Sequence, residues 1–157
     1  MKHYLIRMMA FAILSLLSLP FLTARAEGLN IHPFFKEEFA KNPAVTMVSV
    51  SGRQSGWKGL TSYRSVSISG DDAKADEMAR AVRKDGAKAE LKETSFKGGH
   101  LYFGFYGLGG VGPNRRYLFF LDLRAQGKSK TTLVYIEGDW TPDQVKKLIT
   151  KKIDRHE

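Results

Sequence analysis

The sequence predicts an α+β protein with a mainly antiparallel sheet of about five to six strands and helices packed on one face. Short segments of alternating apolar and polar residues are typical of strands. Turn residues separate these segments at short intervals, which favours antiparallel neighbours. Segments with apolar residues three and four positions apart indicate helices. The predicted order of elements is α-β-β-α-β-β-β-β-α.

The first helix is expected from Pro33 to Lys41. Proline suits the first position of a helix, and Phe35 and Phe39 lie four residues apart on one face. Pro43 disfavours a helical backbone in the residue before it, so the helix should end there.

Two strands are expected next, from Thr46 to Ser51 and from Leu60 to Ser69. Each alternates apolar and polar residues, which indicates one polar face. The segment between them, residues 52–59, is polar and glycine-rich and contains Trp57. The serines of the two strands lack the sequence motif of a serine nucleophile and are interpreted as solvent-facing. They are Ser49, Ser51, Ser65, Ser67 and Ser69.

The clearest helix is predicted from Asp71 to Asp85. It has acidic residues at its start and basic residues at its end, and both suit the helix dipole. Gly86 is a favoured residue just beyond a helix end. The apolar stripe of this helix consists of Ala75, Met78, Ala79 and Val82.

Four further strands are expected at Ala87–Phe96, His100–Tyr106, Arg116–Leu123 and Thr132–Glu137. The first carries alternating charges, as a solvated edge strand does. The last two are apolar on both faces, which is typical of central strands. Asp122 lies on a central strand, and a buried carboxylate needs a partner. Arg64 or Arg116 is the expected partner.

The last helix is predicted over residues 142–150. Thr141 is a good N-cap, and Gln144 at the third helical position completes a capping box. Trp140 is expected to pack on Val145 as a hydrophobic staple.

Residues 1–26 have the pattern of a cleaved secretory signal peptide. Two basic residues precede an apolar segment from Met8 to Leu22, and Ala24-Arg25-Ala26 supplies the small residues of a cleavage site. The apolar segment is shorter than the roughly 20 residues of a membrane-spanning helix, although an uncleaved N-terminal anchor is the alternative. No cysteine follows, which disfavours a lipid anchor. Residues 27–157 then form one exported domain, periplasmic or envelope-associated, with no transmembrane segment after cleavage.

The composition excludes several classes of function. The chain has 25 basic and 16 acidic residues, and three basic ones lie before the cleavage site, so the mature charge is 22 − 16 = +6. This charge favours anionic surfaces without specifying a partner, and an exported chain is not expected to meet nucleic acid. The absence of cysteine excludes thiol catalysis and cysteine-ligated metals. The histidines are scattered, so neither a metal site nor a cofactor is expected.

The segment from Gly104 to Arg116 is the most unusual part of the chain. Its glycines, with Arg115 and Arg116 beside them, suggest a nest of backbone N–H groups for an anion. A phosphate-binding loop is followed by a helix, however, and a strand follows here. A mobile, exposed connection between two antiparallel strands is therefore the favoured interpretation.

Four residues are candidate ligand contacts: Arg115, Arg116, Trp57 and His100. Trp57 is a candidate because it lies in a polar segment, away from the predicted core. His100 precedes an aromatic strand, but the sequence places no nucleophile or acid beside it, so the role of a general base is disfavoured. No catalytic residue is assigned.

Two segments resemble small exported Bacteroidetes proteins known only as domains of unknown function. They are residues 114–120 (NRRYLFF) and residues 131–140 (TTLVYIEGDW), which lead into the last helix. The resemblance covers nearly the whole predicted domain and implies an envelope location and an α+β fold. It brings no catalytic residues. Many of those proteins carry a lipoprotein cysteine after the signal, and this chain does not.

These observations favour a non-enzymatic envelope protein that binds another envelope protein or an anionic envelope polymer, through its sheet or its glycine-rich loop. The alternative is a hydrolase or carbohydrate-active enzyme. A deep pocket with His100 or a carboxylate pair at its floor would favour the enzyme. A sheet face with exposed aromatic residues would favour binding.

We expect the mature protein to begin at Glu27, because Ala24-Arg25-Ala26 follows an apolar segment of signal-peptide length. Intact-mass measurement or N-terminal sequencing of protein purified from the cell envelope checks this. Recovery of the full-length chain in the inner membrane would contradict it.

Overall fold

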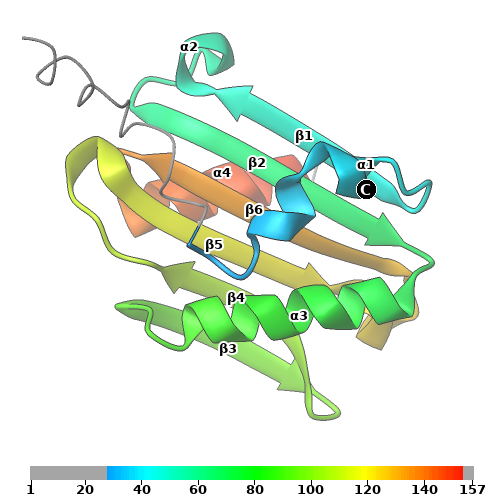
Figure 1. Ribbon diagram of the computed structural model, residues 1–157. Coiled ribbons are helices and arrows are strands. Elements are labelled where there is room, and N and C mark those ends of the chain that lie inside the picture. The colour runs from blue at the N-terminus through cyan, green and yellow to red at the C-terminus, as the bar shows by residue number, and fades with distance from the viewer. Residues whose placement is uncertain (1–27, 154–157) are drawn as a thin grey trace, which may run out of the picture.

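A six-stranded antiparallel sheet organises the chain (Figure 1). The structure is a computed structural model, and it describes residues 28–153. The strand order is β1-β2-β6-β5-β4-β3, and every neighbouring pair is antiparallel. The predicted signal peptide lies outside the described residues. Among the described helices, none is both long and apolar enough to cross a membrane.

The order of the elements confirms the predicted α+β class. The strands are β1 (Val45–Ser51), β2 (Leu60–Ser69), β3 (Leu91–Lys97), β4 (His100–Gly107), β5 (Arg115–Asp122) and β6 (Lys130–Gly138). The α-helices are α1 (Glu37–Ala40), α2 (Gly52–Ser55), α3 (Asp72–Gly86) and α4 (Pro142–Ile153). Short 3-10 turns are η1 (His32–Phe35), η2 (Gly112–Asn114) and η3 (Leu123–Gln126).

Two of the differences from the predicted bounds have a clear cause in the backbone. The first helix is split into η1 and α1, because the backbone of Lys36 is extended (φ −81°, ψ 148°). The strand expected from Ala87 begins only at Leu91, because Ala87 keeps a helical backbone at the end of α3.

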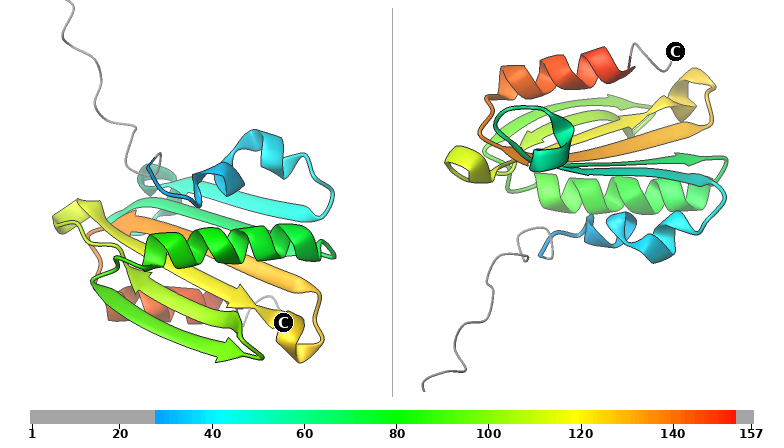
Figure 2. Two further views of the ribbon diagram at one scale, coloured as in Figure 1. Left: turned by 60° about the horizontal axis from the view of Figure 1, so that its bottom comes forward. Right: turned by 90° about the horizontal axis from the view of Figure 1, so that it is seen from above.

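The helices pack on both faces of the sheet, so the prediction of one covered face was wrong. Figure 2 shows α3 and the η1–α1 segment on one side and α4 on the other. The physical reason lies in β5 and β6, which have buried side chains on both faces. Their alternate residues form two separate cores, one with Met78 of α3 and one with Val145 of α4.

Tyr106 shows how closely α3 packs on the sheet. A Cβ on Gly86 of α3 would lie 2.3 Å from the Tyr106 ring, and a Cβ on Gly104 of β4 would lie 2.6 Å from it. Both positions must therefore be glycine for the ring to fit between helix and sheet. Burial raises the pKa of the Tyr106 hydroxyl.

The start of α4 has the predicted capping box. The Thr141 N–H donates to Gln144 Oε1 at 2.8 Å, and the Gln144 N–H donates to Thr141 Oγ1 at 3.4 Å. Trp140 packs against the same apolar cluster that contains Val145. These contacts fix where the helix begins and how it meets the sheet.

We expect Thr141→Ala to lower the free energy of unfolding by roughly 0.5–2 kcal/mol, because the first turn of α4 loses its cap. Chemical denaturation measures this change. Thr150→Ala is the matched control, since Thr150 is an exposed threonine later in the same helix. Equal effects of the two substitutions would argue against the cap.

Candidate binding groove on the open half of the sheet

The side of the sheet that carries α4 is only partly covered. In Figure 2 (right), α4 runs over one end of the sheet and leaves the other end open. A groove of about 580 Å³ lies on this side. Its lining comes mainly from β1, β2, β5 and β6, with two residues from α4. The lining residues are Thr46, Val48, Tyr63, Ser65, Ser67, Ser69, Phe119, Leu121, Leu123, Lys128, Lys130, Thr132, Val134, Ile149 and Lys152.

The period-2 pattern of the strands creates this groove. Along β2, the buried residues Val66 and Ile68 point toward α3, and the intervening serines point into the groove. The hydroxyls of Ser67 and Thr132, on neighbouring strands, form a hydrogen bond of 2.9 Å. These serines therefore lie on the half of the sheet that no helix covers, which agrees with their interpretation as solvent-facing. This half of the sheet is concave.

The floor of the groove is apolar. Phe119 and Val134 are almost fully buried, and Leu121 is half-buried beside them. The hydroxyls of β1, β2 and β6 form a polar strip along this floor. A surface of this kind can take a ligand with both an apolar part and hydrogen-bonding groups.

The charges around the groove have one sign. Lys128, Lys130 and Lys152 line it, and no lining residue is acidic. The Lys152 ammonium lies 4.8 Å from the centre of the Tyr63 ring and 4.9 Å from that of Trp57. Burial raises the pKa of the Tyr63 hydroxyl, so this phenol is neutral at physiological pH.

Arg115 and Arg116, two of the candidate ligand contacts, have different surroundings in the structure. Because neighbours on a strand point to opposite faces, the two guanidinium groups lie on opposite sides of the sheet. Arg115 lies beside the Tyr117 hydroxyl, where its charge offsets part of the rise in pKa that burial causes there. Arg116 donates to the carbonyl of Leu108 at 3.1 Å.

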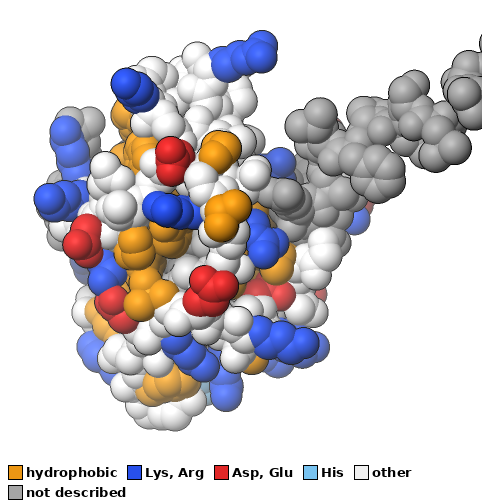
Figure 3. Space-filling model, turned by 90° about the vertical axis from the view of Figure 1, so that its left-hand side faces the viewer, with side chains coloured by type: hydrophobic (Ala, Val, Ile, Leu, Met, Phe, Trp, Pro, Cys, Tyr) orange, Lys and Arg blue, Asp and Glu red, His pale blue; other side chains and the backbone are white. Residues whose placement is uncertain are grey.

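Backbone hydrogen bonds stabilise the conformation of the glycine-rich loop. The Leu108 N–H donates to the Arg116 carbonyl at 2.8 Å, and the Arg116 N–H donates to the Gly109 carbonyl at 3.0 Å. A Cβ on Gly110 would lie 2.1 Å from the Asn114 carbonyl oxygen, so the loop closes tightly at this glycine. Figure 3 views this end of the molecule and shows basic, acidic and apolar side chains interspersed. The arrangement does not favour an anion cradle here.

Trp57 and His100 lie at opposite ends of the sheet. The Trp57 ring packs against Tyr63 and Trp140, with ring centres 6.1 and 6.3 Å apart. This contact places Trp57 at the closed end of the groove. His100 is exposed as the first residue of β4, and the described residues give its imidazole no hydrogen-bond partner.

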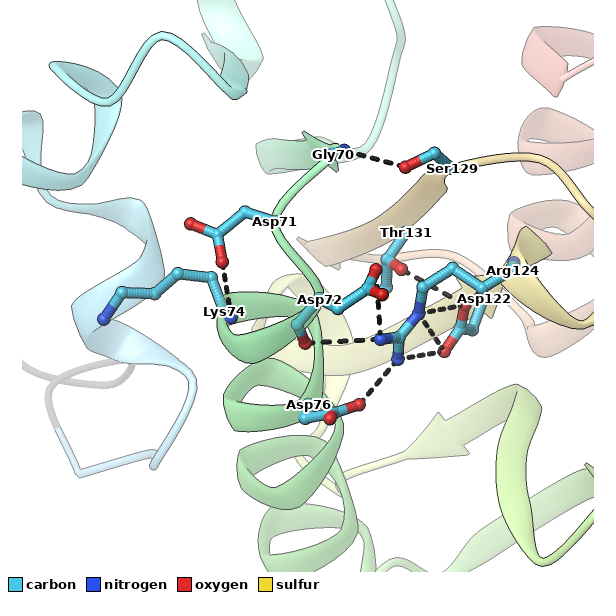
Figure 4. A network of polar contacts seen from close by, with 9 residues as sticks. All are labelled: Gly70, Asp71, Asp72, Lys74, Asp76, Asp122, Arg124, Ser129 and Thr131. Atoms are coloured by element: carbon cyan, nitrogen blue, oxygen red, sulfur yellow. Dashed lines mark hydrogen bonds and ion pairs between the residues drawn. The ribbon is translucent and has the colours of Figure 1, made fainter.

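A second hollow, of about 520 Å³, lies between His100 and the start of α3. A polar network centred on Arg124 forms part of its wall (Figure 4). Arg124 Nη2 lies 2.7 Å from Asp122 Oδ2 and 2.8 Å from Asp76 Oδ1. The Thr131 hydroxyl also donates to Asp122, at 3.2 Å. This network connects η3 to α3, and the acidic groups that line the hollow form ion pairs within it.

The partner of Asp122 is therefore Arg124, and the expected partners Arg64 and Arg116 were wrong. The 3-10 turn after β5 brings residue 124 back over residue 122, which a continuous strand would not do. Burial alone would raise the pKa of Asp122, which is 5% exposed. Hydrogen bonds from Arg124 and Thr131, with the charge of Arg124, outweigh burial and lower that pKa below its ordinary value. Hydrogen bonding to Asp122 also raises the pKa of the Arg124 guanidinium.

The comparison with protein families gives one match. A family model described as a family of unknown function (DUF6108) matches residues 19–149. The chain belongs to DUF6108. This agrees with the resemblance to domains of unknown function. No curated protein and no solved structure matches this DUF6108 chain.

The groove was not predicted from the sequence. Its lysines lie in the connection from η3 to β6, at the first position of β6 and at the end of α4, where they resemble ordinary solvated charges. One signal was present: Ser65, Ser67 and Ser69 alternate along a strand that is paired on both sides. Such a hydroxyl row marks a face of an interior strand that no helix covers.

We expect Asp122→Asn to lower the free energy of unfolding by about 1–3 kcal/mol at pH 7, because Arg124 loses a charged partner. The folded-state pKa of Asp122 lies below its unfolded value, so its stabilisation is present above the unfolded pKa and disappears as pH falls through the folded pKa. The difference between wild type and variant should therefore shrink below about pH 4. Denaturation at several pH values measures it.

Glu38→Gln is the control for this pH series, since Glu38 is exposed and forms no ion pair with other described residues. Its difference from wild type should stay small at every pH. A constant Asp122→Asn difference down to pH 2 would contradict the assignment.

Proposed function

We propose that this DUF6108 protein is an exported, non-enzymatic binding module, and that it binds an anionic amphiphile in the groove on the α4 side of the sheet. The observation that carries the proposal is the composition of the groove. An apolar floor, a strip of hydroxyls and three lysines line it, and acidic residues are absent from its lining.

The two halves of such a ligand have separate contacts. An acyl chain or similar apolar segment covers mainly Leu121 and Val48, because Phe119 and Val134 beneath are already almost fully buried. The gain is roughly 25 cal/mol for each Å² of apolar surface removed from water. The anionic group lies at the rim near Lys130, and no acidic residue is among those that line the groove. The volume of about 580 Å³ falls in the range of small-molecule sites.

The expected envelope location agrees with this ligand class. The cell envelope is rich in molecules that combine acyl chains with phosphate or carboxylate groups. The proposal is narrower than the sequence-based expectation of an anionic envelope polymer, because a polymer without an apolar part would leave Val48 and Leu121 uncovered. The second hollow does hold His100 and aspartates, as the hydrolase alternative requires, but Arg124 pairs with these carboxylates, so we propose no second function.

Dodecanoate, below its micelle concentration, is a suitable probe. We expect saturable binding by calorimetry, with NMR shift changes at Ser65, Ser67 and Thr132 in the groove. Acetate has the charge without the tail, and dodecyltrimethylammonium has the tail with the opposite charge. Both should bind at least tenfold more weakly.

Lys130→Glu should weaken dodecanoate binding about tenfold, since it reverses a charge at the rim. Lys92→Glu is the matched control: it makes the same charge change at an exposed position on β3, outside the groove. Equal losses in the two variants would mean that net charge, and not the groove, determines binding. Shift changes confined to residues outside the groove would also overturn the proposal.

A further inference from the structure

The two edges of the sheet are built differently. β3, at one edge, carries Lys92, Glu93 and Lys97, and its pairing with β4 contains a register shift between Ser95 and Phe96. Charges and bulges of this kind are how proteins block pairing with other chains. β1, at the other edge, has the sequence VTMVSVS, with no charge and no proline. Its register with β2 is regular throughout.

We infer that β1 is a self-association edge, at which two copies of this chain pair antiparallel about a two-fold axis at Val48. Val48 is the central residue of β1 and is 44% exposed, an unusual exposure for a large apolar residue in the described part of the chain. β-branched residues dominate the strand and have high β propensity. Among the strands of residues 28–153, only β2 lies beside it, so no described strand pairs with its outer N–H and C=O groups.

In this arrangement, the residues of β1 that face one another across the two-fold axis are compatible with each other. With Val48 opposite Val48 of the second copy, Thr46 lies opposite Val50 and Met47 lies opposite Ser49. No charged residues face one another across the axis. Two valines directly opposite form a favourable cross-strand pair. A strand pair of this type has its two-fold axis perpendicular to the sheet, so α4 lies on the same side in both copies.

The pairing also completes the groove. Thr46 and Val48 form its wall at the β1 edge, beyond which the monomer has no further strand. In the dimer, β1 of the second copy continues this wall, and the two grooves become neighbours on one twelve-stranded sheet. This second copy is favoured over a foreign peptide because it supplies both the matching valine and the continuation of the groove.

The association should be weak. A seven-residue strand pair buries less than the roughly 1,200–2,000 Å² of a standard interface, so we expect a Kd on the order of 10 μM. Sedimentation equilibrium of the purified protein, without added ligand, should show a monomer–dimer equilibrium. This measurement does not depend on the proposed function.

Charge pairing at the axis gives the decisive test. Val48→Lys and Val48→Glu should each weaken dimerisation at least tenfold, because like charges then oppose one another. A mixture of the two variants should recover a heterodimer. Phe96→Lys is the matched control, since Phe96 is 51% exposed on the opposite edge strand. It should leave dimerisation unchanged.

A second variant tests the register directly. The natural chain has no cysteine, so Val48→Cys introduces a single thiol. Under mild oxidation it should form a disulfide-linked dimer, whereas Phe96→Cys should not. The inference is overturned if wild type stays monomeric at the highest concentration reached and Val48→Cys gives no crosslink. It is also overturned if Val48→Lys remains folded and dimerises as wild type does.

Discussion

The need to cover both faces of β5 and β6 determines the architecture of this protein. These two strands lie in the middle of the sheet, and most of their side chains, on both faces, are buried. A helix is about 10 Å wide and strands are about 4.8 Å apart, so one helix covers roughly two strands. On one face, α3 and the η1–α1 segment share this task. On the other face, α4 alone is available.

The groove follows from this unequal cover. The 12 residues of α4 span about 18 Å, whereas the ten residues of β2 span about 33 Å. The strands that α4 does not reach cannot expose large apolar side chains without a cost in solubility. Serine and threonine occupy those positions instead, and lysines surround them. The polar lining is thus a direct consequence of the length of one helix.

Local signals in the sequence predicted most of the fold. The bounds of β2 agree with the prediction, because its period-2 pattern lies between two glycine-containing turns. The start of α4 was predictable because the capping box is encoded within four residues. The use of both faces was harder to predict, although the apolar character of β5 and β6 on both faces already pointed to it. The Asp122–Arg124 pair depends on a 3-10 turn that neither residue reveals by itself.

The aromatic contacts at the closed end of the groove have a spectroscopic consequence. The chain contains two tryptophans, and Trp57 and Trp140 lie with ring centres 6.3 Å apart. Trp57 also lies beside the Lys152 ammonium, a group that alters the emission of a nearby indole. The intrinsic fluorescence of the protein therefore originates at one place, where α4 meets β2. Any molecule that displaces Lys152 from these rings would change that signal without an attached label.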